Sequence, residues 1–291
     1  MNYFNNREEN IAHAKTHIEY VKSMYPVYID ISVYNSRIYD YYSPDSIYNK
    51  IDKKLDNPKI YNIDKNYKDE FMTINPFLYN ERVNIEKCTT VDCIREASMP
   101  SYTLENNKVG VLNFASYKNP GGKFLEGSMA QEESLCHHST LYPVLERCNE
   151  FYEFNRTHLN NSLYNHRVLY TPNIIFDDRY AVDVLTCAFP NMGPYSHYRK
   201  PINTEYYIDL LSNRVDSIFQ TAWMNDVHTL ILGAIGCGVF KNSPAVVANI
   251  FANRIKVVWL ENFSKIIFAI PDDYTLDIFT STFKEVLGEQ L

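Results

Sequence analysis

Two adjacent carboxylates, Glu132 and Glu133, follow Gln131 at the expected start of a helix. Successive helical residues lie about 100° apart around the axis, so the two carboxylates cannot share one face. This spacing favours two separate roles over one proton-sharing pair: one carboxylate can hold a ligand while the other transfers a proton. An acidic pair in a first turn also has a purely structural explanation, because it complements the helix dipole.

A glycine pair precedes this helix. Gly121 and Gly122 lie in the loop S-Y-K-N-P-G-G-K-F-L-E-G, where the missing side chains let the backbone adopt positive φ and approach a ligand. Ser128, with Gln131 three residues later, fits a capping box and predicts that the helix begins there, with its positive end towards the loop. A glycine loop that leads into a helix N-terminus is typical of a site for a phosphate-bearing ligand.

The segment from Val109 to Leu145 contains both features and resembles a known signature. Its string V-L-N-F-A-S-Y-K-N-P-G-G-K-F-L-E-G-S-M-A-Q-E-E-S-L is similar to that of the microbial-type poly(ADP-ribose) glycohydrolases, macrodomain proteins with a triple-glycine loop, a spacer and Gln-Glu-Glu. Lys123 stands where the family has its third glycine. Two further blocks, from Thr186 to Asn191 and from Leu230 to Pro244, resemble the strand end and the second phosphate loop of the family.

The resemblance implies a glycosidase and assigns roles to residues. Glu133 would be the general acid, a carboxyl with a raised pKa that protonates the leaving oxygen, and Glu132 would hold ribose hydroxyls. Water would be the acceptor, and Phe240 would stack on or beside the adenosine. The expected substrate-binding residues are Gln131, Asn119, Gly121, Gly122, Lys123, Asn191, Gly236, Cys237, Gly238, Val239 and Phe240. The expected partners are poly(ADP-ribose) or ADP-ribosylated proteins, with ADP-ribose as the product ligand.

Strands alternate with helices along most of the chain. Sequence patterns predict strands at 82–86, 108–115, 163–176, 179–188, 229–234 and 265–270, and helices at 7–24, 91–98, 204–224, 245–259 and 274–287 besides the one at Ser128. This order predicts a three-layer α/β/α fold with a mixed, largely parallel central sheet and a ligand crevice at the carboxyl ends of the strands. Such a fold agrees with the macrodomain that the resemblance implies.

The beginning of the chain has a different texture. Residues 7–24 form an amphipathic pattern, whereas residues 25–80 are rich in Tyr, Asn, Asp, Ile and Lys and show no lasting period. We therefore expect an N-terminal helical and irregular accessory region at 1–80, packed on a macrodomain-like catalytic core at 81–291. The two parts are expected to form one structural unit.

Composition limits the location and the partners. No run of about 18 apolar residues exists and the first residues are polar, so we expect a soluble intracellular protein, cytoplasmic or, in a eukaryotic or viral setting, nuclear, with no membrane partner. The formal net charge of −7 gives no basic face for direct DNA binding. Local loops would have to hold a polyanionic partner. We expect a monomer.

Neither the cysteines nor the histidines indicate a metal or another cofactor. The six cysteines show no C-x-x-C pair, so free thiols in a reducing compartment are expected. Cys237 has no base beside it in the sequence, which disfavours a nucleophilic role. His13 and His17 lack an acidic third ligand and are expected to be solvated, and the pair His137-His138 is expected to pack or contact solvent.

Other functions remain open. A macrodomain that binds ADP-ribose without cutting it would need both glycine loops but neither Glu132 nor Glu133, so these two residues favour an enzyme. A mono-ADP-ribosyl-protein hydrolase is a further alternative. A scaffold with a degenerate pocket would explain Lys123 and the Tyr-rich residues 25–80.

Overall fold

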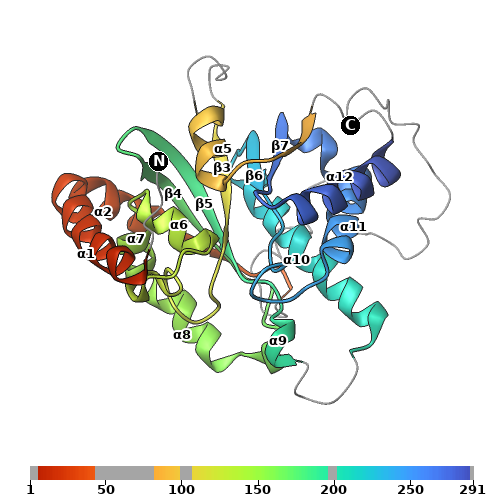
Figure 1. Cartoon of the computed structure of the whole chain (residues 1–291), viewed down its shortest axis with the longest axis horizontal. Helices are drawn as coiled ribbons and strands as arrows, with labels where there is room; N and C mark the ends of the chain where they lie inside the picture. Colours follow the sequence, from red (N-terminus) through yellow and green to blue (C-terminus); the bar gives the residue numbers. More distant parts are fainter. Residues whose placement is uncertain (1–5, 43–81, 99–106, 196–201, 289–291) are drawn as a thin grey trace, which may run out of the picture.

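The computed structural model describes residues 6–42, 82–98, 107–195 and 202–288. The strands in these ranges are β1 (Arg37–Tyr39), β2 (Val83–Glu86), β3 (Val109–Phe114), β4 (Val168–Phe176), β5 (Tyr180–Cys187), β6 (Thr229–Leu232) and β7 (Lys265–Ala269). They form one sheet in the order β1-β4-β5-β3-β6-β7-β2 (Figure 1). The pairs β1-β4 and β4-β5 are antiparallel, and the other pairs are parallel. The prediction of a mixed, largely parallel sheet is confirmed.

Helices cover both faces of the sheet, which gives the predicted three layers (Figure 1). Side chains of β3 alternate between two hydrophobic cores, with Val111 in one and Leu112 in the other. The helices of the Val111 core are α1 (Arg7–Met24), α2 (Pro26–Asn35), α5 (Thr90–Ala97), α6 (Gln131–His137), α7 (Leu141–Arg147) and α8 (Asn149–Thr157). The helices of the Leu112 core are α10 (Thr204–Met224), α11 (Pro244–Arg254) and α12 (Asp273–Leu287). Among the described residues, no helix combines the length and the apolar character that a membrane crossing needs.

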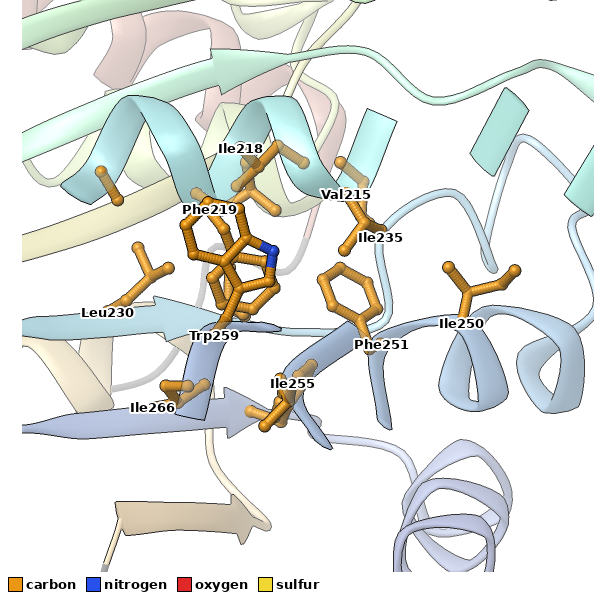
Figure 2. Close-up of a cluster of buried hydrophobic side chains, with 14 of the residues drawn as sticks. Val215, Ile218, Phe219, Leu230, Ile235, Ile250, Phe251, Ile255, Trp259 and Ile266 are labelled. Atoms are coloured by element: carbon orange, nitrogen blue, oxygen red, sulfur yellow. The ribbon is translucent and has the colours of Figure 1, made fainter. Parts of the chain in front are cut away.

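Aromatic rings dominate the Leu112 core. Phe219 of α10 stacks on Trp259 with 5.5 Å between the ring centres and meets Phe251 of α11 edge-on at 6.2 Å. Figure 2 shows these rings beside Leu230 of β6 and Ile266 of β7. Large rings that pack on two neighbouring strands bury much apolar surface, which holds β6 and the loop after it in place.

Two predicted elements have different bounds in the structure. The strand predicted over 163–176 begins only at Val168, because Tyr164 has a φ of 65°, which a strand cannot continue. The helix predicted over 245–259 changes after Arg254 into a π-helical turn. The remaining predicted strands and helices lie where the sequence patterns indicated, within a few residues.

The N-terminal region contributes to the sheet. Helix α1 has the predicted bounds and is capped by Asn6, whose side chain accepts the N–H of Glu9. Helix α2 and strand β1 follow where no lasting period was found, and β1 pairs with β4 through Ile38 and Leu169. Most of the Tyr-rich region, residues 43–81, lies outside the described residues.

The expectation of six free thiols is wrong. Cys88 and Cys93, five residues apart, form a disulfide. Strand β2 ends at Glu86 and α5 begins at Thr90, so a tight turn brings the two cysteines together, a spacing that a search for C-x-x-C does not detect. The free cysteines are Cys136, Cys148, Cys187 and Cys237.

The expectation of a solvated histidine pair on α1 is also wrong. The ring of His13 stacks on His17, and the Nδ1 atoms of His13 and His137 lie 2.9 Å apart in a hydrogen bond. The Nε2 of His17 lies 2.9 Å from the carbonyl oxygen of Ser139. Burial lowers the pKa of His137 to about 3, so this ring is neutral at physiological pH. The histidines therefore fasten α1 to α6.

Candidate active site

The three sequence blocks that resemble the family all include residues that follow a strand at the same end of the sheet. Strands β5, β3 and β6 are parallel neighbours, so their carboxyl ends meet. We call residues 115–130, which follow β3 and lead into α6, the first glycine loop. The second glycine loop, residues 233–243, follows β6, and residues 188–191 follow β5.

Glu132 is buried beside the first glycine loop and held by hydrogen bonds. Its Oε1 accepts from Asn113 Nδ2 at 3.2 Å and its Oε2 accepts from the N–H of Ser116 at 2.6 Å. Burial, with a smaller contribution from the nearby Glu133, raises the pKa of Glu132 to about 8, although these hydrogen bonds lower it. A carboxyl that can carry a proton at neutral pH is therefore present at this position.

Glu133 is also buried, with 6% of its surface exposed. Its Oε1 accepts from the N–H of Lys123 at 2.8 Å. Among the described residues, no hydrogen bond reaches its second oxygen. One oxygen is therefore fixed by the loop while the other can interact with a ligand. The two carboxyls thus have different partners.

The two glycines of the first loop are required by this packing. Gly121 and Gly122 have φ of 66° and 60°, a region that favours glycine. A Cβ on Gly122 would lie 2.5 Å from Glu133 Oε1 and 3.0 Å from Glu132 Oε2. A Cβ on Gly121 would lie 2.7 Å from the Tyr142 ring. The loop backbone therefore lies directly against the carboxyls.

The predicted capping box at Ser128 is not formed. Helix α6 begins at Gln131, with Ala130 at the N-cap position and no side-chain cap. The Gln131 side chain instead binds the backbone of β3, where its Oε1 accepts from the N–H of Phe114 and its Nε2 donates to the carbonyl of Leu112, both at 2.8 Å. Gln131 therefore anchors α6 to the sheet.

Lys123 occupies the position of the family's third glycine without backbone strain. Its φ is −110°, which any residue can adopt. Its side chain is 68% exposed, and its Nζ lies 3.9 Å from Glu126 Oε2. Asn119 closes the turn before it, because the Asn119 carbonyl accepts the N–H of Gly122 at 3.0 Å.

Asn242 holds the second glycine loop. Its buried side chain donates to the carbonyls of Gly236 and Pro190, both at 2.8 Å, and so ties this loop to the segment after β5. Gly236 has a φ of 77°, and a Cβ there would lie 2.6 Å from Asn242 Nδ2. Burial raises the pKa of Cys237 to about 12, which favours the protonated thiol.

Three aromatic rings connect the two glycine loops. Tyr117 of the first loop stacks on Tyr164 with 4.0 Å between the ring centres, and Tyr164 meets Phe240 of the second loop edge-on at 6.3 Å. We call these three rings the aromatic bridge. Phe240 is partly buried against it, whereas Val239 is 75% exposed.

Two further predicted residues lie beside these elements. The Oδ1 of Asn191 accepts from the N–H of Gly193 at 3.3 Å, and its own N–H donates to the carbonyl of Ser162 at 2.8 Å. A Cβ on Gly238 would meet no atom within 4 Å, so the second loop is open there. The predicted residues thus lie on the two glycine loops, at the start of α6 and after β5, but the side chains of Gln131 and Lys123 have partners away from the carboxyls.

Four further residues of the site were not predicted from the sequence: Asn113, Ser116, Asn242 and Tyr164. Asn113 had a detectable signal, because a polar residue inside the apolar run V-G-V-L-N-F-A needs a buried partner. Ser116 acts through its backbone, and the partners of Asn242 and Tyr164 are distant in sequence, so no local pattern could reveal them.

Among the described ranges, one group of side chains could hold a metal ion: Glu86, Cys88 and Cys93. Two of its members are joined in the disulfide. The group lies at the end of β2, in the turn after it and on α5, and includes neither carboxyl of the candidate site.

A sheet with both glycine loops and a buried carboxyl pair at the carboxyl ends of its strands defines a macrodomain-like hydrolase. The model of the family "Microbial-type PARG, catalytic domain", where PARG is poly(ADP-ribose) glycohydrolase, matches residues 29–177. The chain belongs to this family, whose members are glycosyl hydrolases that act on poly(ADP-ribose). No curated protein sequence matches the chain.

Solved structures of bacterial poly(ADP-ribose) glycohydrolases have the same fold. The enzyme from Thermomonospora curvata superimposes with a TM-score of 0.76 at 24% identity, over 95% of this chain and 100% of that chain. The same enzyme bound to the inhibitor ADP-HPD gives 0.74 at 24% identity and the same coverage. The enzyme from Deinococcus radiodurans in complex with ADP-ribose gives 0.68 at 25% identity, over 89% of this chain and 98% of that chain.

Proposed function

We propose that this chain hydrolyses the ribose-ribose O-glycosidic bonds of poly(ADP-ribose) and releases ADP-ribose. The observation that carries the proposal is the pair of buried carboxyls, Glu132 and Glu133, packed against the glycine loop in a member of this family. A protein that only binds ADP-ribose would need the loops but neither carboxyl. Burial of two carboxyls side by side is unfavourable, so their presence supports chemistry.

Glu133 is the proposed general acid. Its second oxygen has no hydrogen bond from the described residues, so a proton there can pass to the leaving ribose oxygen as positive charge develops on the sugar. Both oxygens of Glu132 accept a hydrogen bond, from Asn113 and from Ser116. A carboxylate has about four acceptor sites in all, so Glu132 can also accept from a ribose hydroxyl.

Burial decides whether a carboxyl at this place carries a proton. The start of a helix favours the charged form by about 0.3–1 kcal/mol, which is less than one pKa unit. Burial can raise a carboxyl pKa by about 3–5 units. The pKa of Glu132, raised to about 8, supports the dominance of burial. The negative charge of a substrate diphosphate nearby would favour the protonated form of Glu132 further.

One short segment of each glycine loop is proposed to hold the diphosphate of ADP-ribose. The first offers the segment Gly121 to Lys123 and the second the segment Gly236 to Phe240. Water is the acceptor, and Phe240 stacks on or beside the adenosine, supported by its contact with Tyr164. We further propose that the protein is an intracellular monomer without metal or other cofactor, that it does not bind DNA directly, and that it meets its substrate as polymer or on ADP-ribosylated proteins.

Single-turnover release of ADP-ribose from automodified protein tests this proposal, beside calorimetric binding of free ADP-ribose. Glu133→Gln keeps the shape of the side chain but cannot donate an acidic proton, so its rate should fall by about 10²–10⁴-fold while the Kd for ADP-ribose changes little. Glu132→Gln should weaken binding and lower the rate together. Unchanged turnover in Glu133→Gln would remove its assignment as the acid. Tight binding of ADP-ribose by the unmutated protein, without release from any modified protein or polymer, would favour the binding module.

A further inference from the structure

An open cleft of about 400 Å³ lies between the first glycine loop and the start of α1. Asn6, Arg7 and Asn10 line it from α1, and Lys123 and residues 126–129 line it from the loop. Its members come from segments more than a hundred residues apart in sequence, so only the folded chain creates it. The cleft includes no residue that the proposed reaction uses as an acid or as a ribose ligand.

The walls of the cleft carry more positive than negative charge. Arg7 and Lys123 each approach the same acceptor, Glu126 Oε2, at 3.9 Å. The three side chains are 70%, 68% and 57% exposed, so each can turn towards a ligand. Two cations share one carboxylate here, in a chain with a net charge of −7. Glu8 and Glu9 of the same helix do not line the cleft. An anion is the ligand that this arrangement favours.

A buried amide in the wall points to a ligand that also carries donor groups. Asn10 is 5% exposed, and its Nδ2 donates to the carbonyl of Gly127 at 3.1 Å. Its Oδ1 is buried and has no hydrogen-bond partner in the described part of the chain. An unpaired buried oxygen is unfavourable, and a ligand hydroxyl or amine that reached it would satisfy it.

The cleft adjoins the proposed reaction centre through one residue. The N–H of Lys123 donates to Glu133 Oε1 at 2.8 Å, while the Lys123 side chain lines the cleft. In the proposed reaction, Glu133 protonates the oxygen of the leaving group. This leaving group is the next unit of the polymer. That unit carries two phosphates, ribose hydroxyls and an adenine amine, which are the groups that the cleft walls match.

We propose that this cleft binds the neighbouring ADP-ribose unit of the polymer on the leaving-group side of the cleaved bond. Arg7 and Lys123 contact its phosphate, and Asn10 accepts a hydrogen bond from its sugar or base. Glu126 competes with the phosphate for both cations and so weakens the contact. This inference rests on the proposed glycohydrolase function, and it makes the rate on polymer depend on residues that a substrate without a neighbouring unit does not use.

The test compares two substrates at low and at high salt. One is poly(ADP-ribose), and the other is an ADP-ribose conjugate with an uncharged aryl leaving group. At low salt, Arg7→Gln should lower kcat/KM on polymer by about threefold to tenfold, and Glu126→Gln should raise it by about twofold to fivefold. Both effects should shrink at high salt. Neither variant should change kcat/KM on the aryl conjugate or the Kd for ADP-ribose. Lys15→Gln, which removes an exposed cation from α1 outside the cleft, should leave both substrates unaffected.

A second variant separates charge from packing, because Arg7 Nε also donates to the carbonyl of Glu126 at 2.8 Å. Arg7→Lys keeps the cation without this bond and should retain most of the rate on polymer. Equal losses on both substrates in Arg7→Gln, or a fall on polymer in Glu126→Gln, would overturn the inference. A fall in kcat/KM of Arg7→Gln that occurs only with ADP-ribose attached to an acidic carrier protein would also overturn it. The cleft would then bind the carrier protein and not the polymer. Absence of turnover on polymer in the unmutated protein would instead refute the proposed function.

Discussion

The backbone of Gly122 lies against the carboxylate of Glu133 so closely that no side chain fits between them. A Cβ at this position would come within 2.5 Å of Oε1, and the φ of 60° strains any other residue. The N–H of the next residue, Lys123, donates to the same oxygen at 2.8 Å. Loop and acid therefore position each other, and a change in one displaces the other.

Gly122→Ala should accordingly disable the site. A left-handed backbone strains a residue other than glycine by about 1–3 kcal/mol, and a displacement of about 1 Å at a reacting group can lower the rate about 100-fold. We expect kcat/KM to fall at least that far, with a lower Tm. Gly238→Ala is the matched control for stability, because a Cβ there meets nothing within 4 Å. A fully active Gly122→Ala would show that the loop does not hold the acid.

The stability of the protein should depend on pH through Glu132. Burial raises its pKa from 4.5 to about 8. Between these values the folded state holds a proton that the unfolded state has lost, so the contribution of Glu132 to stability is complete below pH 4.5 and declines as the pH rises to about 8. Each pKa unit corresponds to about 1.4 kcal/mol. Urea unfolding from pH 5 to 8.5 should show Glu132→Gln gaining stability relative to the unmutated protein, and parallel curves would contradict this.

Tyr164 should act on the reaction through Phe240. Its ring lies between Tyr117 and Phe240, and each aromatic contact of this kind contributes about 0.5–1.5 kcal/mol. Tyr164→Ala should therefore weaken binding of ADP-ribose and lower kcat/KM by about tenfold. Tyr164→Phe keeps both ring contacts and should stay within about twofold of the unmutated protein. A large fall in Tm without a change in Kd would reduce the aromatic bridge to a packing feature.

Lys123→Gly would restore the family's third glycine. Because the φ of Lys123 is −110°, the substitution relieves no strain and removes one cation from the loop. A charge-assisted contact contributes about 1.5–3 kcal/mol when it is well formed, and less at an exposed site such as this one. We expect activity to persist with a modest rise in KM, measured on polymer at increasing salt. A tenfold rise in kcat would instead identify Lys123 as a lesion and strengthen the binding or scaffold alternatives.

Excess chelator should leave hydrolysis unchanged. The proposed acid is a protein carboxyl, and the group Glu86, Cys88 and Cys93, which could hold an ion, includes no residue of the candidate site. Cys88→Ser provides the control, because it removes both a potential ligand and the disulfide without touching the glycine loops. Loss of activity with chelator, restored by a divalent ion, would place this chain in another class of hydrolase.

The order of elements and the carboxyl pair could be predicted because their signals are local. The change from alternating to helical periodicity marks β3 and α6, and the two glycines between them are contiguous in sequence. The start of α6 could not be predicted, because the Gln131 side chain, which the capping pattern assigns to the helix terminus, binds the backbone of β3 instead. A capping pattern does not reveal a competing partner in another element.

Long-range partners account for the other differences. His13 and His17 show a helical spacing that suits a solvated pair, but His137 approaches them from a segment more than a hundred residues later. Tyr164, which has a positive φ and lies in the aromatic bridge, is not part of the strand predicted to begin at Leu163, and this strand begins only at Val168. In both cases tertiary contacts override a local preference, and one sequence alone does not show which contact wins.

The central strand has consequences for how this protein can be divided. Strand β3 lies between β5 and β6, and both of these neighbours come after residue 177, where the match to the family model ends. Helix α1, which fastens α6 through its histidines, ends before residue 29, where the match begins. A fragment cut at these limits would keep the first glycine loop and both carboxyls but would leave both edges of β3 unpaired, an arrangement that invites aggregation. The signature segment therefore cannot be transferred alone to another protein. Strands β5 and β6 and helix α1 would have to be transferred with it.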